Sequence, residues 1–215
     1  MTKSGGLRDR KKAQTRERIA DAAAALFAER GYDAVTMFDV AMASDVSDQT
    51  VYNYFSAKQD LVLDRAEQFR EMYRDAVRQR RPGCSPAAAL GPLVEADIER
   101  YRHTDLDLAR GQFPAQSVES GVLRRFTLEE RERQVEVMTE AVVATTPELA
   151  KVVALSHCAA IVAVIQAIYD QIGSSVLDRS PQNASADDML RTLDVAFSSL
   201  DRTFSDVLST TETSK

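Results

Sequence analysis

The segment from residue 31 to residue 58 constrains the fold of this chain most strongly, because its residue order defines two short helices separated by a tight turn. Thr36 has a hydroxyl that can cap a first helix, and Asp39, three positions later, completes a capping-box pattern. After the turn, Ser47 is placed to cap a second helix that runs to Phe55. This arrangement is typical of a helix-turn-helix motif.

Helical periodicity extends on both sides of this motif. Before it, from Thr15 onward, apolar residues recur at the spacing of one helix face, and Gly31 is placed to end that helix. These apolar residues are Ile19, Ala22, Ala23, Leu26 and Phe27. After the motif, Ser56 is placed to cap a further helix, with Gln59 at the capping-box position. The sequence therefore predicts a compact three-helix domain over residues 15–60.

The residue order of the motif resembles the DNA-binding domain of the TetR family of bacterial one-component regulators. The positions that carry the resemblance are Gly31, Thr36, Val40, Ala41, Val46, Ser47, Thr50, Val51, Tyr52, Tyr54, Phe55 and Lys58. The resemblance implies that the second helix of the motif lies in the major groove of DNA, where Thr36 and Tyr52 contact phosphates. It also implies that Lys58 anchors the neighbouring helix on the DNA backbone. Asp45 stands at a turn position that the family most often fills with glycine, so the turn must accommodate an aspartate there.

The second helix of the motif presents polar, uncharged side chains on its outer face. Gln49 and Asn53 can make paired hydrogen bonds to adenine, and Thr50 can contact a thymine methyl group. At the start of the first helix, Met37 and Phe38 could either contact DNA or pack. The predicted DNA-contacting residues are Thr36, Met37, Gln49, Thr50, Tyr52, Asn53, Tyr54 and Lys58.

Charge is unevenly distributed along the chain. The protein has a formal net charge of −6, and residues 19–60 contain two basic and seven acidic side chains. The first 18 residues reverse this balance, with seven basic and two acidic side chains. Since non-specific DNA affinity comes from neutralised phosphates, we expect a flexible basic arm over residues 1–14 to supply much of it. Two alternatives remain open: the arm is a charged tail without contacts, or the protein has kept the fold and lost DNA binding.

Beyond the motif the chain continues as a series of helices without a strand pattern. Capping residues, prolines and glycines place these helices at about residues 56–80, 85–102 and 122–144, then from 146 and from 185 onward. At 215 residues and 44% hydrophobic content, the chain is long enough for a second, larger core. We therefore expect an all-α protein. The resemblance implies that residues 61–208 form an effector-binding and dimerisation domain, followed by a flexible tail at 209–215.

The last two expected helices have the features of an interface. One is almost wholly apolar from residue 158 to 168, and the other has apolar residues in alternating steps of three and four. A helix that is apolar on all sides needs more than one neighbour, so we expect a second copy of the chain to cover it. The expected contact residues are Ile161, Ile165, Ile168, Leu193, Phe197, Leu200 and Phe204. The resembling family pairs these helices as a four-helix bundle, which implies a homodimer on an inverted-repeat operator in double-stranded DNA.

Compartment signals in the sequence agree with one another. A transmembrane interpretation of residues 152–169 is weaker than a core helix, because Ser156, His157 and Gln166 interrupt the apolar run. The amino terminus has no apolar signal-peptide core, and the two cysteines have neither metal-binding nor redox spacing. We therefore expect a cytoplasmic protein without a membrane partner and without a cofactor.

The resemblance implies a pocket for an unidentified small molecule, enclosed mainly by helices between residues 56 and 144, whose occupation changes operator affinity. Candidate lining residues are aromatic, sulfur-containing or isolated polar side chains on otherwise apolar faces, and each could equally be an ordinary core residue. They are Phe69, Met72, Tyr73, Asp97, Tyr101, Phe113, Phe126, Met138 and Gln166. Asp97 and Gln166 are the better candidates, because a polar group on a buried face needs a partner.

An enzyme is the main alternative from another functional class. His103, Asp105 and Asp107 alternate along the chain and could hold a divalent metal ion if that segment were extended. Aspartate is also common at helix caps, and no second cluster supplies further ligands. We therefore expect no enzymatic activity. The sequence favours a ligand-responsive transcriptional regulator, most simply a repressor that leaves its operator when a small molecule binds.

Overall fold

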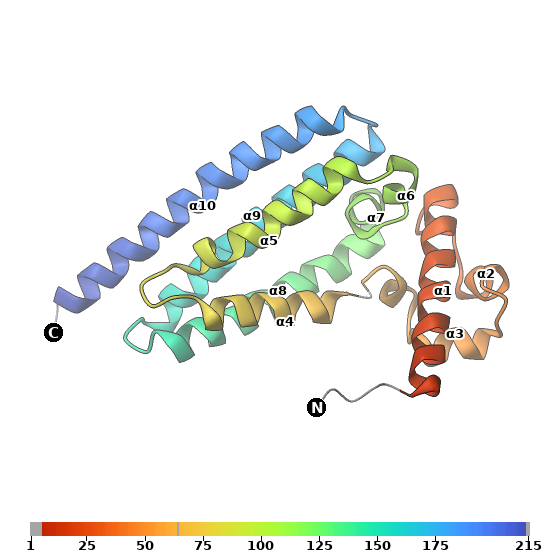
Figure 1. Cartoon of the computed structure of the whole chain (residues 1–215), viewed down its shortest axis with the longest axis horizontal. Coiled ribbons are helices and arrows are strands. Elements are labelled where there is room, and N and C mark those ends of the chain that lie inside the picture. The colour runs from red at the N-terminus through yellow and green to blue at the C-terminus, as the bar shows by residue number, and fades with distance from the viewer. Residues whose placement is uncertain (1–5, 64, 214–215) are drawn as a thin grey trace.

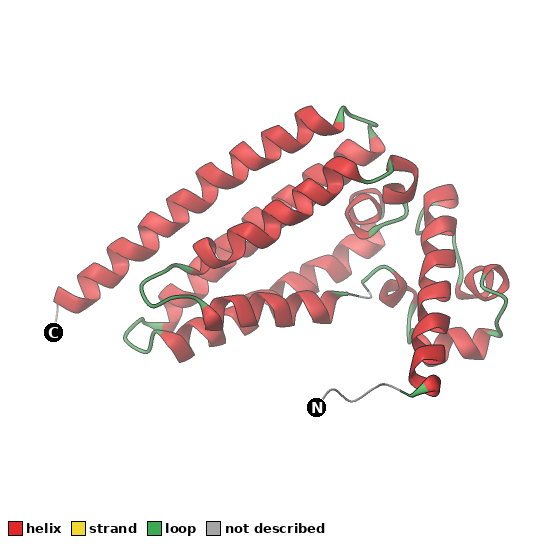
Figure 2. Ribbon diagram, viewed as in Figure 1, coloured by secondary structure: helices red, strands yellow, loops and turns green. Residues whose placement is uncertain are grey.

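The computed structural model describes residues 6–63 and 65–213, and every regular element within them is helical (Figure 2), which confirms the all-α expectation. The helices form two bodies (Figure 1). The smaller body contains α1 (Leu7–Arg30), α2 (Met37–Ala43), α3 (Asp48–Tyr54) and the short 3-10 helix η1 (Lys58–Leu61). The larger body contains α4 (Ala66–Gln79), α5 (Pro86–His103), α6 (Leu106–Arg110), α7 (Phe113–Glu119), α8 (Gly121–Thr145), α9 (Lys151–Leu177) and α10 (Gln182–Thr213).

The smaller domain has its own apolar core. Ile19 and Phe27 of α1, Val40 of α2 and Val51 of α3 are each at most 1% exposed. Leu123 of α8 packs into the same core from the larger domain. The two domains therefore meet through a shared apolar contact as well as through the chain between them.

Helix α1 begins at Leu7 and not at Thr15, so residues 7–14 of the expected flexible arm are helical. The backbone N–H of Gly6 donates to the carboxylate of Asp9 at 3.2 Å, which satisfies one free donor at the helix start. Most of the residues that follow are good helix formers, and no proline or glycine interrupts them before Gly31. Residues 1–5 lie outside the described part of the chain.

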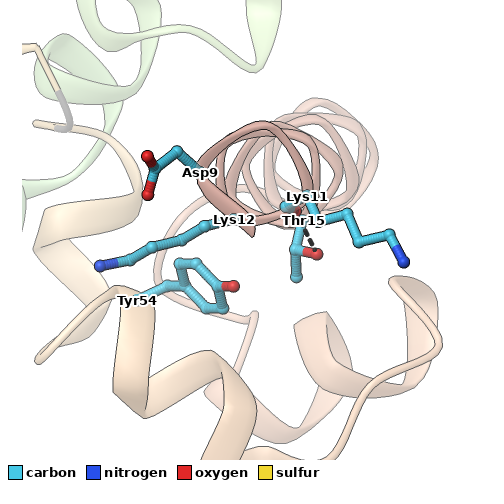
Figure 3. A pocket seen from close by; sticks show the side chains of 5 residues that line it. All are labelled: Asp9, Lys11, Lys12, Thr15 and Tyr54. Atoms are coloured by element: carbon cyan, nitrogen blue, oxygen red, sulfur yellow. Dashed lines mark hydrogen bonds between the residues drawn. The ribbon is translucent and has the colours of Figure 1, made fainter. Parts of the chain in front are cut away.

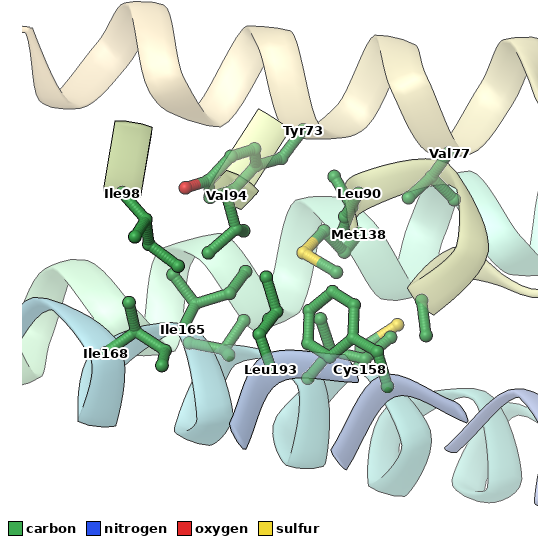
Figure 4. Packing of buried hydrophobic residues seen from close by; sticks show 14 of the residues in the cluster. Tyr73, Val77, Leu90, Val94, Ile98, Met138, Cys158, Ile165, Ile168 and Leu193 are labelled. Atoms are coloured by element: carbon green, nitrogen blue, oxygen red, sulfur yellow. The ribbon is translucent and has the colours of Figure 1, made fainter. Parts of the chain in front are cut away.

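Helix α9 is the centre of the larger domain. It contacts α5, α6, α7, α8 and α10. Figure 4 shows buried side chains of α9 packed together with side chains of α4, α5, α8 and α10. Leu90 of α5, Met138 of α8, Ile165 of α9 and Leu193 of α10 are each at most 3% exposed. By length and composition alone α9 could cross a membrane. Within this bundle it is a core helix.

The helix expected at residues 56–80 is divided in two. Asp60 accepts hydrogen bonds from the Ser56 hydroxyl at 2.6 Å and from the Ala57 backbone N–H at 3.0 Å, and these bonds close the short turn of η1. Helix α4 then begins separately at Ala66. The capping pair lies one residue later than expected, with Ala57 at the N-cap and Asp60, not Gln59, at the capping-box position, and the short helix ends at Leu61.

The last two helices also have shifted boundaries. Helix α9 begins at Lys151 and not at residue 146, because the Leu149 N–H donates to the Thr146 carbonyl at 3.1 Å and closes a separate turn first. Helix α10 begins at Gln182, directly after Pro181, and continues to Thr213. Residues 209–213 of the expected tail are therefore helical, while residues 214–215 are outside the described part.

The residues expected at the dimer contact lie inside one subunit, so that assignment was wrong. Six of the seven are at most 7% exposed in the single chain, and Leu200 is half-buried. The reason is that α5 covers the apolar seam of α10: a Cβ placed on Gly91 would lie 3.7 Å from the Phe197 ring. The opposite faces stay open, with Val152 of α9 69% exposed and Val195 of α10 70% exposed.

Candidate nucleic-acid interface and effector site

The turn between α2 and α3 is built by local hydrogen bonds. Thr36 caps α2 by accepting the Asp39 backbone N–H at 3.1 Å, while the Asp39 carboxylate accepts the Thr36 N–H at 2.8 Å. These bonds to Thr36 lower the pKa of Asp39. Asp45 follows with φ of 50°, the left-handed conformation that the turn requires. Ser47 then caps α3 by accepting the Thr50 N–H at 3.2 Å.

Helix α3 divides its side chains between the core and the surface. Val51 is fully buried, and Phe55, the residue that follows the helix, is 1% exposed. Tyr52 is 49% exposed, and Gln49 and Asn53 are exposed beside it, with the Gln49 amide donating to the Asn53 side-chain oxygen at 3.2 Å. The face available to a DNA groove therefore carries Gln49, Tyr52 and Asn53.

Two residues expected to contact DNA face the protein instead. Met37 is 7% exposed and packs with Val40 and Ala41, which lie three and four positions later on the same helix face, so its assignment to DNA was wrong. Its neighbour Phe38 is 58% exposed and takes the outward position. Tyr54 is half-buried between α3 and α1, where Figure 3 shows its ring beside Lys12.

Lys58 folds back onto the small domain. Its ammonium lies 4.2 Å from the centre of the Tyr32 ring and donates to the Asp33 carbonyl at 3.3 Å. Partial burial lowers the pKa of Lys58, and the carboxylates of Asp33 and Asp39 act in the opposite direction and raise it. In this structure Lys58 contacts the segment before α2. The hydroxyl of Thr50 is hydrogen-bonded to that of Ser47 at 2.8 Å, at an exposed position.

A hollow of about 570 Å³ lies between the start of α1 and the end of α3. Asp9, Lys11, Lys12, Thr15 and Tyr54 line it, and both lysines are exposed (Figure 3). Arg16 fixes the angle between the two helices, because its guanidinium donates to the Tyr54 carbonyl at 2.6 Å and stacks 4.3 Å from the Phe55 ring. The basic end of α1 is thus held beside the acidic helix-turn-helix.

Four of the expected effector residues converge in the larger domain around Tyr169, which the sequence analysis did not select. Tyr169 donates its hydroxyl proton to Asp97, and its hydroxyl also interacts with that of Tyr73. Phe113 meets the Tyr169 ring edge-on at 6.2 Å, and Phe69 lies 6.3 Å from Tyr73. The sequence did contain a signal for Tyr169: it is an aromatic residue with a hydroxyl group, it lies in an apolar segment, and it follows the polar Gln166 by three positions.

The other effector candidates have separate surroundings. The Gln166 amide donates to Asp170, which is paired with Arg124. Tyr101 is 5% exposed, and its hydroxyl has no hydrogen-bond partner in the described part of the protein. Met138 is fully buried, and Met72 and Phe126 are half-buried. A hollow of about 280 Å³ lies elsewhere, between α5 and α10, and none of the candidates lines it.

Gln116 of α7, also missed from the sequence, connects the two domains. It is fully buried, and its amide oxygen accepts the Tyr32 backbone N–H at 2.7 Å. Nearby, the Ser120 hydroxyl donates to the Asp33 carboxylate at 2.6 Å. At Gly111, an added Cβ would lie 1.9 Å from the Ala24 carbonyl oxygen, so the start of this connection lies directly on α1.

The residues proposed for a metal-dependent enzyme have structural roles. Asp105 caps α6 by accepting the N–H groups of Asp107 and Leu108 at 2.8 and 3.3 Å, and Asp107 pairs with Arg179 at 2.8 Å. His103 is exposed at the last position of α5. Within residues 6–63 and 65–213, no group of three or more His, Cys, Asp or Glu side chains is arranged to hold a metal ion.

Known proteins share both the motif and the fold. The family model "Bacterial regulatory proteins, tetR family" matches residues 19–64. The chain is similar to the HTH-type transcriptional regulator TcmR from Streptomyces glaucescens, with 29% identity over 102 residues that cover 47% of this chain and 45% of TcmR. The match thus spans about half the length of that relative.

Solved structures resemble most of the chain. NalD from Pseudomonas aeruginosa, the secondary repressor of the MexAB-OprM multidrug efflux pump, has a TM-score of 0.57 and 18% identity, over 86% of this chain and 97% of NalD. FadR from Bacillus subtilis, solved in complex with stearoyl-CoA, has a TM-score of 0.52 and 18% identity, over 82% and 96%. With its capped turn, its polar α3 face and this match of the motif, the segment from residue 19 to residue 64 is identified as a DNA-binding domain of the TetR family of bacterial regulatory proteins, and the rest of the chain shares the fold of the solved structures.

Proposed function

We propose that the protein is a transcriptional repressor that binds an inverted-repeat operator in double-stranded DNA as a homodimer and leaves it when a small molecule binds the larger domain. The observation that carries this proposal is the exposed face of α3, which presents Gln49, Tyr52 and Asn53. The exposed Lys11 and Lys12 of α1 line a hollow that also includes Tyr54 at the end of α3. Polar side chains on a helix supply base contacts, and neighbouring lysines supply phosphate contacts.

The relatives support the regulatory and the ligand-binding parts of this proposal. TcmR is a transcriptional regulator, NalD is a repressor, and FadR was solved with a small molecule bound. As a regulator of transcription the protein would act in the cytoplasm, and neither DNA binding nor effector response requires a cofactor.

The open face of α9 supports the homodimer. Val152, Leu155, Ala159, Ala163 and Ala167 follow one another along this helix at helical spacing, and all are exposed. A continuous apolar stripe on a soluble protein marks an interaction surface. A second copy of the chain would cover the stripe by a two-fold contact, in which the same face of each subunit pairs with itself.

A mobility-shift titration with the DNA upstream of the protein's own gene tests the proposal. We expect the double variant Tyr52→Ala, Asn53→Ala to lose the shift, and the variant Gln79→Ala, exposed near the end of α4, to keep it. Unchanged binding in the double variant contradicts the assignment of α3 as the reading helix. A complete absence of a shift at low salt would favour a protein that has kept the fold and lost DNA binding.

The salt dependence of the same titration tests whether the basic start of α1 contacts DNA phosphates. Each phosphate contact contributes about 0.9 to the slope of log affinity against log salt concentration. The variant Lys11→Ala, Lys12→Ala should therefore reduce the magnitude of that slope by roughly 2 if both lysines neutralise a phosphate. An unchanged slope would show that the basic end of α1 makes no contact with DNA.

A further inference from the structure

Three polar side chains meet inside the larger domain between α4, α5 and α9. Tyr169 donates to Oδ2 of Asp97, and the hydroxyl groups of Tyr73 and Tyr169 are close enough to interact. The side chain of Asp97 is only 9% exposed. A carboxylate is therefore held in a mainly apolar helical bundle, at the end of a short chain of hydroxyl groups.

Further aromatic rings pack against the two tyrosines beside this carboxylate. Besides the two tyrosines, Phe113 contacts Tyr169 edge-on and Phe69 contacts Tyr73. Both phenylalanines are half-buried, and Phe113 is the first residue of the short helix α7. The faces of aromatic rings attract cations, most strongly where water is excluded. We call Phe69, Tyr73, Asp97, Phe113 and Tyr169 the Asp97 cluster.

The ionic partner of Asp97 is only loosely held. Arg100 approaches Oδ1 at 2.5 Å from one turn along the same helix, but its side chain is 66% exposed. An exposed pair of this kind contributes little to stability. The carboxylate of Glu130 on α8, by contrast, is paired with Arg70, whose side chain is only 23% exposed.

An unpartnered hydroxyl lies one turn beyond Asp97 on the same face of α5. Tyr101, four residues later, is 5% exposed, and its hydroxyl has no hydrogen-bond partner among the residues that the structure describes. A buried hydroxyl without a partner is uncommon in folded proteins and indicates a missing water molecule or ligand. Asp97 and Tyr101 thus offer a charge and a hydrogen bond that the protein itself does not fully use.

We infer that the Asp97 cluster is the effector site of the regulator proposed above, and that the effector is a hydrophobic organic cation. Its charge would replace Arg100 at the Asp97 carboxylate, and Arg100 would move into solvent, where most of its side chain already lies. A neutral or anionic compound would bury the carboxylate without compensating its charge. The rings fill the site here, so entry requires Phe113, at the start of α7, to move aside. This inference rests on the proposed function.

Calorimetric titration of the full-length protein with two ions of nearly equal size and opposite charge tests the inference. We expect tetraphenylphosphonium to bind at least about tenfold more tightly than tetraphenylborate. The variant Asp97→Asn should weaken tetraphenylphosphonium binding by about tenfold or more, because it removes the charge and keeps an acceptor for Tyr169. The control Glu95→Gln removes the same charge from an exposed position on the same helix and should leave binding unchanged.

Equal affinity for the two ions, or unchanged tetraphenylphosphonium binding in a folded Asp97→Asn variant, overturns the inference. If that variant does not fold, Tyr169→Phe provides the test, since it keeps the ring and frees Oδ2 of Asp97. We expect equal or tighter tetraphenylphosphonium binding there, and a loss of affinity would show that the cluster is only structural.

The mobility shift, measured on the same samples, separates the two proposals. Tetraphenylphosphonium binding without any DNA shift contradicts the proposed function and leaves the cation site standing. A DNA shift without tetraphenylphosphonium binding contradicts the cation site alone.

Discussion

Replacing Gln116 with leucine tests how strongly the two domains are joined. The Gln116 amide accepts the Tyr32 backbone N–H at 2.7 Å and donates to the carbonyls of Arg110 and Phe27 at 2.6 and 3.3 Å. Leucine fills a similar volume but can form none of these bonds. The Phe27 carbonyl keeps a partner, because it also accepts the Gly31 N–H at 2.9 Å. The Tyr32 N–H and the Arg110 carbonyl lose theirs.

The size of the effect follows from these two groups. A buried polar group left without a partner costs about 1–3 kcal/mol, which gives about 2–6 kcal/mol for two such groups. Because the bond to the Arg110 carbonyl is only partly buried, we expect the free energy of unfolding to fall by an amount in the lower part of that range, about 2–4 kcal/mol. In a chain of this length, 1 kcal/mol lowers the melting temperature by about 2–4 °C, which gives a decrease of roughly 4–16 °C.

Thermal unfolding followed by circular dichroism measures this change, with protein concentration held constant because a dimer's stability depends on it. Gln112→Leu is the matched control, since Gln112 is exposed at the start of α7 and makes no capping bond with its side chain. A surface change of this kind should stay within about 0.5 kcal/mol of the wild type. If Gln116→Leu has the same melting temperature as the Gln112→Leu control, the hydrogen bonds of Gln116 do not hold the domains together.

Three further predictions concern packing, pH and assembly. Gly111→Ala should lower stability by about 1–3 kcal/mol in urea denaturation, because its Cβ would meet the Ala24 carbonyl at 1.9 Å, whereas Gly121→Ala, which faces open space, should not destabilise. Burial lowers the pKa of His157 from 6.5 to about 4, so the unfolded chain binds the proton more tightly, and stability should be retained above pH 6.5 and fall towards pH 4. His157→Gln should reduce this loss, and His103→Gln, at an exposed position, should keep it. Ala163→Glu on the open face of α9 should shift the mass measured by light scattering from dimer to monomer, and Gln79→Glu should not; a dimer in both variants would place the interface elsewhere.

The sequence predicts the helix-turn-helix well because its determinants are local. Thr36 and Ser47 cap the helices that follow them, and Val51 faces the core while Tyr52 faces out, as the spacing requires. Asp45 adopts the left-handed turn conformation at the position where the family usually has glycine. Each of these features depends on residues within one or two turns of helix.

The errors concern helix faces whose neighbours lie far away in the sequence. The seam of α10 was apolar as expected, but only the fold shows that α5 covers it and that no second subunit is needed there. Met37 was placed on the wrong side of α2 for the same reason, since its burial depends on the packing of α2 against the rest of the small domain. Tyr169 and Gln116 could not be selected from the sequence, because their roles depend on partners that only the fold places beside them. These partners are Asp97 for Tyr169 and the Tyr32 N–H for Gln116.

Helix α7 links the Asp97 cluster to the DNA-binding domain within seven residues. Phe113 contacts Tyr169 at its first position, and Gln116, one turn later, holds the Tyr32 N–H at the end of α1. The backbones of α7 and α9 already touch at Gly173 of α9, where there would be no room even for a Cβ: an added one would lie 2.2 Å from the Pro114 carbonyl oxygen. The backbone of α7 therefore cannot move towards α9. A ligand that displaces Phe113 together with its helix must therefore shift α7 away from α9, and so change the position of Gln116 against α1. A ligand that only rotates the Phe113 side chain leaves Gln116 in place and gives α1 no signal, so the response to an effector depends on which of these two movements costs less.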